Sequence, residues 1–128
     1  MTRQIKVLVV EDDRINQMVL CKILELRGIT PVCVSDGFEA LEYFSENDDL
    51  DLVLMDIQLP GMDGIETTAK IRKIDENRGK RTPVVALTAY FAAGNGGDLF
   101  SQDFDDYAVK PVDYEFLVRL IKKHTFKY

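Results

Sequence analysis

The chain alternates between short apolar strand patterns and segments with helical periodicity, and this alternation constrains its fold more than any other feature. Apolar strand patterns occupy residues 5–10, 30–34, 50–55, 83–87 and 107–109. Aspartates stand at the N-cap positions of four helical patterns, namely Asp13, Asp36, Asp63 and Asp113. Strands separated by helices favour a parallel sheet covered on both faces. The sequence therefore predicts an α/β fold with a doubly wound, five-stranded parallel sheet.

The length and charge of the chain limit the classes of function that it can have. The 128 residues suit one domain, and 16 Lys and Arg against 22 Asp and Glu give a net charge of −6. Proteins that hold nucleic acid by bulk charge need the opposite sign, so we expect no direct nucleic-acid binding. No apolar run approaches the ~20 residues of a membrane span, and the N-terminal residues contain no signal-peptide pattern. We expect a cytoplasmic protein that does not bind membranes.

The first helical pattern and the two cysteines carry separate expectations. Apolar residues recur at helical spacing and predict one face of a helix that ends near Gly28; they are Ile15, Met18, Val19, Ile23 and Leu26. Cys21 and Cys33 lie in apolar stretches without a CxxC motif or a neighbouring histidine. They are expected to be buried, reduced thiols rather than a disulfide or a zinc site.

Polar residues gather where the predicted strands end. Glu11, Asp12 and Asp13 follow the first strand and Asp56 the third, while Thr88 and Lys110 follow the fourth and fifth. In a doubly wound sheet these ends meet at one edge, where ligands bind. Clustered carboxylates suit Mg²⁺, and a lysine and a hydroxyl can neutralise phosphoryl oxygens. The set predicts a phosphoryl-transfer site. The acidic turn after the first strand excludes a pyrophosphate-binding glycine loop.

Four motifs on these strand ends resemble those of response-regulator receiver domains of two-component signalling. They are VVEDD at 9–13, LMDIQLPGMDG at 54–64, LTA at 87–89 and VKP at 109–111. The resemblance runs from about Ile5 to the last helix and implies a flavodoxin-like (β/α)5 receiver fold. The sequence of the second motif, together with Arg14, Ile15 and Asn16 after the acidic cluster, is most similar to the corresponding sequences of receivers in hybrid histidine kinases.

The resemblance implies a role for each site residue. Asp56 would accept a phosphoryl group from a phosphohistidine on a partner. Asp12, the Asp56 carboxylate and the backbone carbonyl of Gln58 would bind Mg²⁺, with Glu11 acting through a water. Thr88 and Lys110 would bind the phosphoryl oxygens. Tyr107 would change rotamer as Thr88 moves, and the Lys110–Pro111 peptide would be cis.

The resemblance also implies partners and leaves alternatives open. The phosphoryl donor would be a histidine kinase or a histidine phosphotransfer protein. The chain would be one receiver domain over residues 1–128, without an output domain. It could be part of a longer hybrid kinase. A Mg²⁺-dependent phosphatase-like enzyme on the same fold and a phosphorylation-independent docking module remain alternatives. An enzyme of that kind needs a second catalytic acid near the nucleophile, and Gln58 provides an amide there instead.

Several residues outside the four motifs carry expectations of their own. Asp103, Asp105 and Asp106 are expected in a solvated loop. His124, near the end of the last helix, has no companion ligand in the sequence and is not expected to carry a phosphoryl group. Glycines in the stretch 94–97 predict a short or shifted fourth helix. Tyr90 is expected to slow the loss of the phosphoryl group by its bulk.

Overall fold

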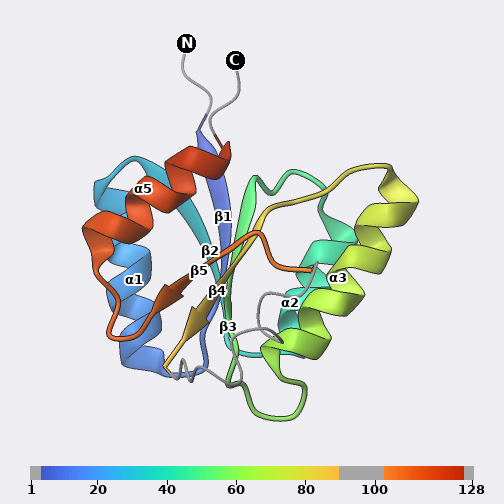
Figure 1. The fold of residues 1–128 in the computed structure, drawn as a ribbon, viewed down its shortest axis with the longest axis horizontal. Coiled ribbons are helices and arrows are strands. Elements are labelled where there is room, and N and C mark those ends of the chain that lie inside the picture. Colours follow the sequence, from blue (N-terminus) through green and yellow to red (C-terminus); the bar gives the residue numbers. More distant parts are fainter. Residues whose placement is uncertain (1–3, 90–102, 126–128) are drawn as a thin grey trace.

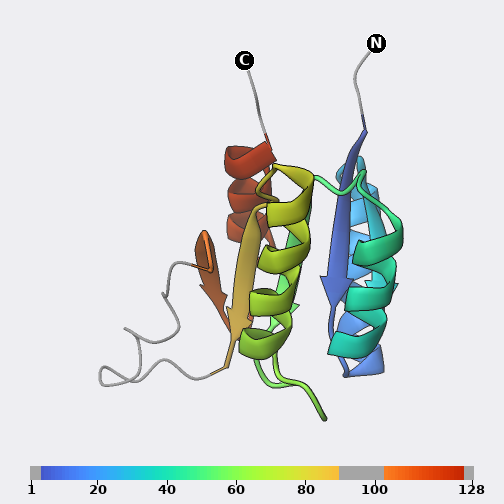
Figure 2. The same cartoon turned by 90° about the vertical axis from the view of Figure 1, so that its right-hand side faces the viewer.

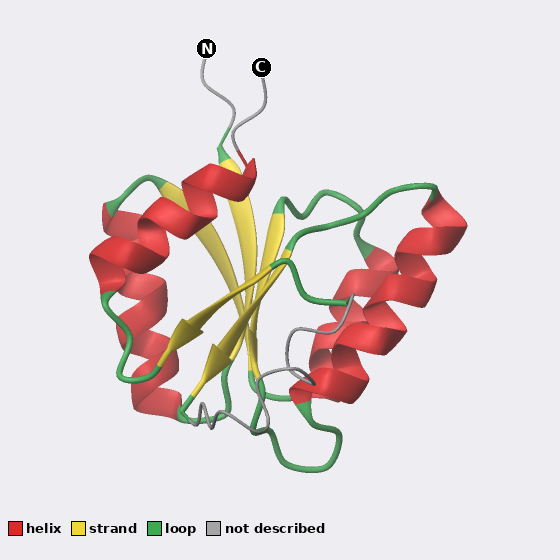
Figure 3. Ribbon diagram, viewed as in Figure 1, coloured by secondary structure: helices red, strands yellow, loops and turns green. Residues whose placement is uncertain are grey.

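The computed structural model describes residues 4–89 and 103–125. Within these residues, five strands form one parallel sheet in the order β2-β1-β3-β4-β5 (Figures 1 and 3). The strands are β1 (Ile5–Val10), β2 (Ile29–Val34), β3 (Leu52–Asp56), β4 (Val84–Thr88) and β5 (Asp106–Val109). This arrangement confirms the predicted doubly wound sheet. Pro31 lies on the edge strand β2, where the missing N–H costs no internal ladder bond.

Four described helices cover the two faces of the sheet. They are α1 (Arg14–Leu26), α2 (Gly37–Glu46), α3 (Gly64–Arg78) and α5 (Tyr114–Thr125). Helices α1 and α5 lie on one face, and α2 and α3 lie on the other (Figures 1 and 2). Successive strand residues point to opposite faces, so Val7 and Val9 join the core under α1 and α5, while Leu8 and Val10 join the core under α2 and α3.

The predicted helix starts are confirmed. The side chains of Asp13, Asp36 and Asp63 accept hydrogen bonds from the third residue beyond each of them, at 2.8–2.9 Å. Asp113 does the same for the N–H of Phe116 at 3.2 Å. Each cap lies in the connection between a strand and the helix that follows it, so the caps fix where the helices begin.

The predicted apolar face of α1 is not its buried face. Leu20, Cys21 and Leu24 contact the sheet, whereas Ile15 is 73% exposed and Met18 is 63% exposed. Two overlapping apolar stripes run along this helix, and hydropathy alone does not decide which of them meets the sheet. The stripe chosen from the sequence is exposed at both ends of the helix, since Leu26 is exposed as well.

The expectation of two reduced thiols is wrong. Cys21 on α1 and Cys33 on β2 form a disulfide, with their Cα atoms 7.0 Å apart. Cys33 stands in register with Val9, so its side chain points toward the face that α1 covers. A spacing of twelve residues gives no pairing signal, because a helix and a reversal separate the two positions.

The expectation of a solvated loop before β5 is also wrong. Asp105 accepts hydrogen bonds from Arg72, Arg81 and the N–H of Val84. His124 Nε2 lies 3.0 Å from Asp106 Oδ2. Both aspartates thus connect β5 to other elements.

The Asp106–His124 pair makes stability depend on pH. Burial alone would raise the pKa of Asp106, but hydrogen bonds from His124 and from the Tyr107 N–H outweigh it and hold the pKa below its ordinary value. A lowered carboxyl pKa stabilises the fold above the unfolded-state pKa, and this contribution disappears as pH falls through the folded-state pKa.

We therefore expect His124→Gln to lower the free energy of unfolding by about 0.5–1 kcal/mol near pH 6. The difference from the parent should shrink as pH falls toward the range where Asp106 protonates. Urea unfolding at a series of pH values measures both. Lys122→Gln, at an exposed position of the same helix, is the control. A His124→Gln deficit that is unchanged down to the lowest pH would contradict the assignment of this stability to the contact between His124 and the Asp106 carboxylate.

Two earlier predictions, the fourth helix around residues 94–97 and the role of Tyr90, lie outside the described residues. Among the helices that the structure does describe, none has the length and apolar character needed to cross a membrane.

Candidate functional site

The strand order brings the predicted site residues to one edge of the sheet. β1 pairs with β3 in parallel, and β3 pairs with β4, so the carboxyl ends of these strands lie side by side. Glu11 and Asp12 follow β1, and Asp56 is the last residue of β3. The chain reverses its order in the sheet at β1, which is where ligand crevices form in this class of fold.

Three carboxylates converge at this edge. Oxygen atoms of Glu11, Asp12 and Asp56 all lie within 4.8 Å of one another. Glu11 and Asp56 are each only 3% exposed, whereas Asp12 is open to solvent. Hard oxygen donors around a partly open position match what Mg²⁺ requires, because that ion keeps waters and takes few protein carboxylates. The donor set therefore fits the predicted metal.

Lys110 enters the same cluster from the loop after β5. Its Nζ lies 2.9 Å from Asp56 Oδ2 and 3.1 Å from Glu11 Oε1. Burial alone would lower the pKa of Lys110, but its hydrogen bonds and charge interactions with the two carboxylates outweigh burial and raise that pKa. The lysine is thus held charged against two buried carboxylates. The Lys110–Pro111 peptide is cis, as predicted.

Backbone groups orient the carboxylates. The N–H of Gln58 donates to Asp56 Oδ1 at 3.1 Å, and the N–H of Asp13 donates to Glu11 Oε2 at 3.0 Å. Glu11 and Asp56 therefore each have one oxygen held by the turn that follows them and the other in contact with Lys110.

Gly64 is a site residue that sequence reasoning missed. Its N–H donates to the carbonyl of Ile57 at 2.9 Å, and a Cβ at this position would collide with the carbonyl oxygen of Asp56. The start of α3 can approach the end of β3 only because no side chain intervenes. A glycine directly after the N-cap Asp63 was the available signal.

Thr88 and Tyr107 stand on the neighbouring strands. Thr88 is buried at the end of β4, and its carbonyl accepts the N–H of Lys110 at 2.7 Å. Tyr107, on β5, is partly buried and packs against the core under α2 and α3. The structure thus places both residues on strands next to the cluster, with Thr88 joined directly to the backbone of Lys110.

Gln17 is a second residue that the sequence did not single out. Its Nε2 donates to the carbonyls of Glu11 and Val34, at 3.1 and 2.8 Å. One side chain of α1 therefore joins the end of β1 to the end of β2. The acidic turn is held in place by this helix as well as by its own strand.

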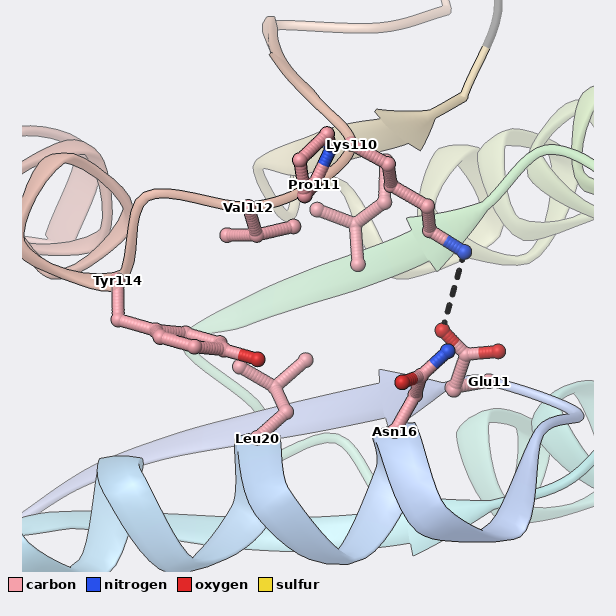
Figure 4. A pocket seen from close by; sticks show the side chains of 8 residues that line it. Glu11, Asn16, Leu20, Lys110, Pro111, Val112 and Tyr114 are labelled. Carbon is pink, nitrogen blue, oxygen red and sulfur yellow. Dashed lines mark hydrogen bonds and ion pairs between the residues drawn. The ribbon is translucent and has the colours of Figure 1, made fainter.

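A cavity of about 300 Å³ opens beside the cluster, between α1 and the loop after β5. Figure 4 shows Lys110 pointing across it toward Glu11, with Asn16 and Leu20 on the α1 side and Val112 and Tyr114 opposite. One end of the cavity is charged, and the remaining wall is mainly apolar. The cavity therefore borders the acidic cluster at Glu11 and Lys110, while Asp12 is open to solvent.

The fold and this edge define a class: a doubly wound parallel sheet with a lysine-bridged acidic pocket. Residues 7–122 match the response regulator receiver domain family, and the chain belongs to it. This is a family of signalling switches rather than of enzymes.

Relatives of known description support this assignment. The chain is 35% identical over 127 residues to hybrid signal transduction histidine kinase I of Dictyostelium discoideum, covering 96% of this chain and 7% of the relative. It is 36% identical over 125 residues to the sensor histidine kinase GacS of Pseudomonas protegens, covering 97% of this chain and 14% of the relative. The chain therefore spans a small part of these proteins.

Solved structures agree with both the fold and the family. One is the receiver domain of the Saccharomyces cerevisiae response regulator Ssk1, in a co-crystal with the histidine phosphotransfer protein Ypd1. For this structure the TM-score is 0.88 at 31% identity, covering 98% of this chain and 91% of the other. Another is the receiver domain of the Pseudomonas aeruginosa sensor histidine kinase PA1611, which has a magnesium ion coordinated in its active site cleft. For that structure the TM-score is 0.85 at 31% identity, covering 96% of this chain and 98% of the other.

Proposed function

We propose that this chain is a phosphoacceptor switch in which Asp56 takes a phosphoryl group from a phosphohistidine on a partner protein. The observation that carries the proposal is the buried Asp56 carboxylate, bridged by Lys110 to Glu11 in a cluster of three acids. A carboxylate in such a position is a nucleophile with its charge-neutralising group already in contact.

The proposed transfer needs few groups. An Asp56 oxygen bonds to phosphorus while the phosphorus–nitrogen bond to the donor imidazole breaks, and the released nitrogen takes a proton from solvent. Asp12, Asp56 and the carbonyl of Gln58 would hold Mg²⁺, with Glu11 acting through a water. The ion, when bound, would neutralise charge on the transferred group. Lys110 is placed to pair with a second phosphoryl oxygen.

The proposed switch acts through neighbouring strands. Phosphorylation raises the negative charge at Asp56 from −1 to about −2 and adds oxygen acceptors. Thr88 is joined to Lys110 through its carbonyl, so both are placed to move toward these oxygens, and Tyr107 on the adjacent strand would follow. The phosphoryl group would shift the population toward the arrangement that satisfies it.

The exposed apolar side chains of α1 support a protein donor. Ile15, Met18 and Val19 lie on the helix that begins directly after the acidic cluster. Exposed apolar groups beside a recessed site are typical of a protein-binding surface. We therefore include a histidine kinase or a histidine phosphotransfer protein in the proposal. A cytoplasmic location stays a prediction.

The decisive experiment is incubation with Mg²⁺ and acetyl phosphate, followed by intact-mass measurement. We expect one phosphoryl adduct in the parent, which disappears in Asp56→Asn and when the metal is chelated. Asp49→Asn, at an exposed position outside the cluster, is the matched control and should keep the adduct. An adduct that survives in Asp56→Asn would overturn the assignment of the acceptor, and a parent without any adduct would favour a docking module.

A further inference from the structure

The disulfide joins two cysteines in very different surroundings. Cys21 is buried in the middle of α1, and Cys33 is exposed on β2, at the edge of the sheet. The bond is the covalent link between this helix and the strand beneath it. Neither cysteine belongs to the acidic cluster, so the site at Asp56 does not account for the pair.

We propose that Cys21–Cys33 is a reversible thiol–disulfide site that sets how firmly α1 is held on the edge strand. A thiol-class reductant such as glutathione would attack first at the sulfur of Cys33, the exposed residue of the pair. Its thiolate bonds to Cys33 Sγ, the Cys21–Cys33 bond breaks, and Cys21 leaves as a thiolate that takes a proton. A second reductant thiolate then releases Cys33 and forms the oxidised small disulfide. Two electrons pass to the protein in all, and the reverse path oxidises it.

Both redox states of the pair can be packed. A reduced Cys21 is a small apolar side chain among Leu20, Leu24 and Val9 in the core, and needs no partner there. A reduced Cys33 remains at the exposed edge. The core can therefore lose the bond without leaving a cavity, which is a condition for a reversible site.

The position of the bond suggests what it would regulate. Gln17, one turn before Cys21, ties α1 to the strand ends through its hydrogen bonds to the carbonyls of Glu11 and Val34. The exposed Ile15 and Met18 lie on the same stretch of helix. Reduction would leave this stretch held by the hydrogen bonds of Gln17 and by the packing of Leu20 and Leu24, without a covalent cross-link. The redox state should therefore change how α1 receives a protein, and much less the chemistry at Asp56.

The chemical arm of the test does not depend on the proposed function. The full chain is equilibrated in glutathione buffers of graded ratio and alkylated with iodoacetamide, and the intact mass is measured. We expect cross-linked and doubly alkylated forms to interconvert without denaturant. Cys21→Ser should form a mixed disulfide with glutathione at Cys33, whereas Cys33→Ser should react little at the buried Cys21. A chain that stays in one form at every ratio would overturn reversibility, and equal reaction of the two single variants would overturn attack at Cys33.

The functional arm rests on the proposed function and uses two phosphodonors. Reduction, or Cys33→Ser, should change the rate of transfer from a phosphorylated histidine phosphotransfer protein by about fivefold or more, the lower end of coupling between linked sites. Labelling by acetyl phosphate should stay unchanged. Equal protein-donor rates in both redox states would overturn the regulatory role. Labelling by neither donor would overturn the phosphoacceptor function, while the thiol titration would still decide whether the redox site exists.

Discussion

Lys110→Met should slow phosphorylation of Asp56 by two to three orders of magnitude while making Mg²⁺ bind more tightly. The slowing follows because the lysine is the charged donor in contact with the acceptor carboxylate, and the loss of one such donor costs about 10²–10³ in rate. The tighter binding follows because Lys110 competes with the metal for the Asp56 and Glu11 oxygens. Removing one positive charge from among these carboxylates should favour the ion by about tenfold, or about 1.4 kcal/mol.

These opposite directions separate Lys110 from a purely structural residue. Calorimetric titration with Mg²⁺ measures the affinity, and intact mass over time with acetyl phosphate measures the rate. Lys122→Met, at an exposed position of α5, removes the same charge away from the cluster and should change neither. If Lys110→Met weakened both metal binding and phosphorylation, a disturbed fold rather than a lost charge would explain the result.

The fold and the acidic pocket were predictable because their signals are local and repeated. Each strand is a short, mainly apolar run, and each described helix is opened by an aspartate at the N-cap. Once the sheet is parallel, the residues after β1, β3 and β5 must meet at one edge, so Asp56 and Lys110 could be placed together without coordinates.

The failures share a different physical cause, because each depends on which surfaces meet across the fold. The choice between two apolar stripes on α1 is decided by the sheet beneath it, and the Cys21–Cys33 bond is decided by the register of β2 against that helix. The partner of His124 is set in the same way, by how the end of α5 packs beside β5. Propensity and periodicity carry no information on these pairings.

Among the unpredicted pairings, the one with the largest expected effect on stability involves Arg72, which lies on α3. Its guanidinium donates to the carbonyls of Asp103 and Thr82 and to Asp105 Oδ2, with its side chain only 11% exposed. Asp75, a buried carboxylate 3.9 Å away, accepts the N–H of Thr82 at 2.6 Å. These groups hold α3 to the amino ends of β4 and β5, at the opposite end of the strands from Asp56.

Arg72→Met should therefore lower the free energy of unfolding by about 3–5 kcal/mol, because it removes the cation beside the buried Asp75 and one of the two cations that pair with Asp105. Urea unfolding measures this loss. The matched control is Arg81→Met: Arg81 also pairs with Asp105, but its side chain is 51% exposed, so about 1 kcal/mol or less is expected. Arg72→Lys should fall between the two, because it keeps the charge without the planar fork that reaches several acceptors. Equal losses in Arg72→Met and Arg81→Met would contradict the view that burial decides how much each arginine contributes to stability.

The group formed by Arg72, Asp75 and Asp105 lies at the opposite end of the strands from the acidic pocket. The folded fraction of Arg72→Met should therefore still acquire the phosphoryl adduct at the parent rate.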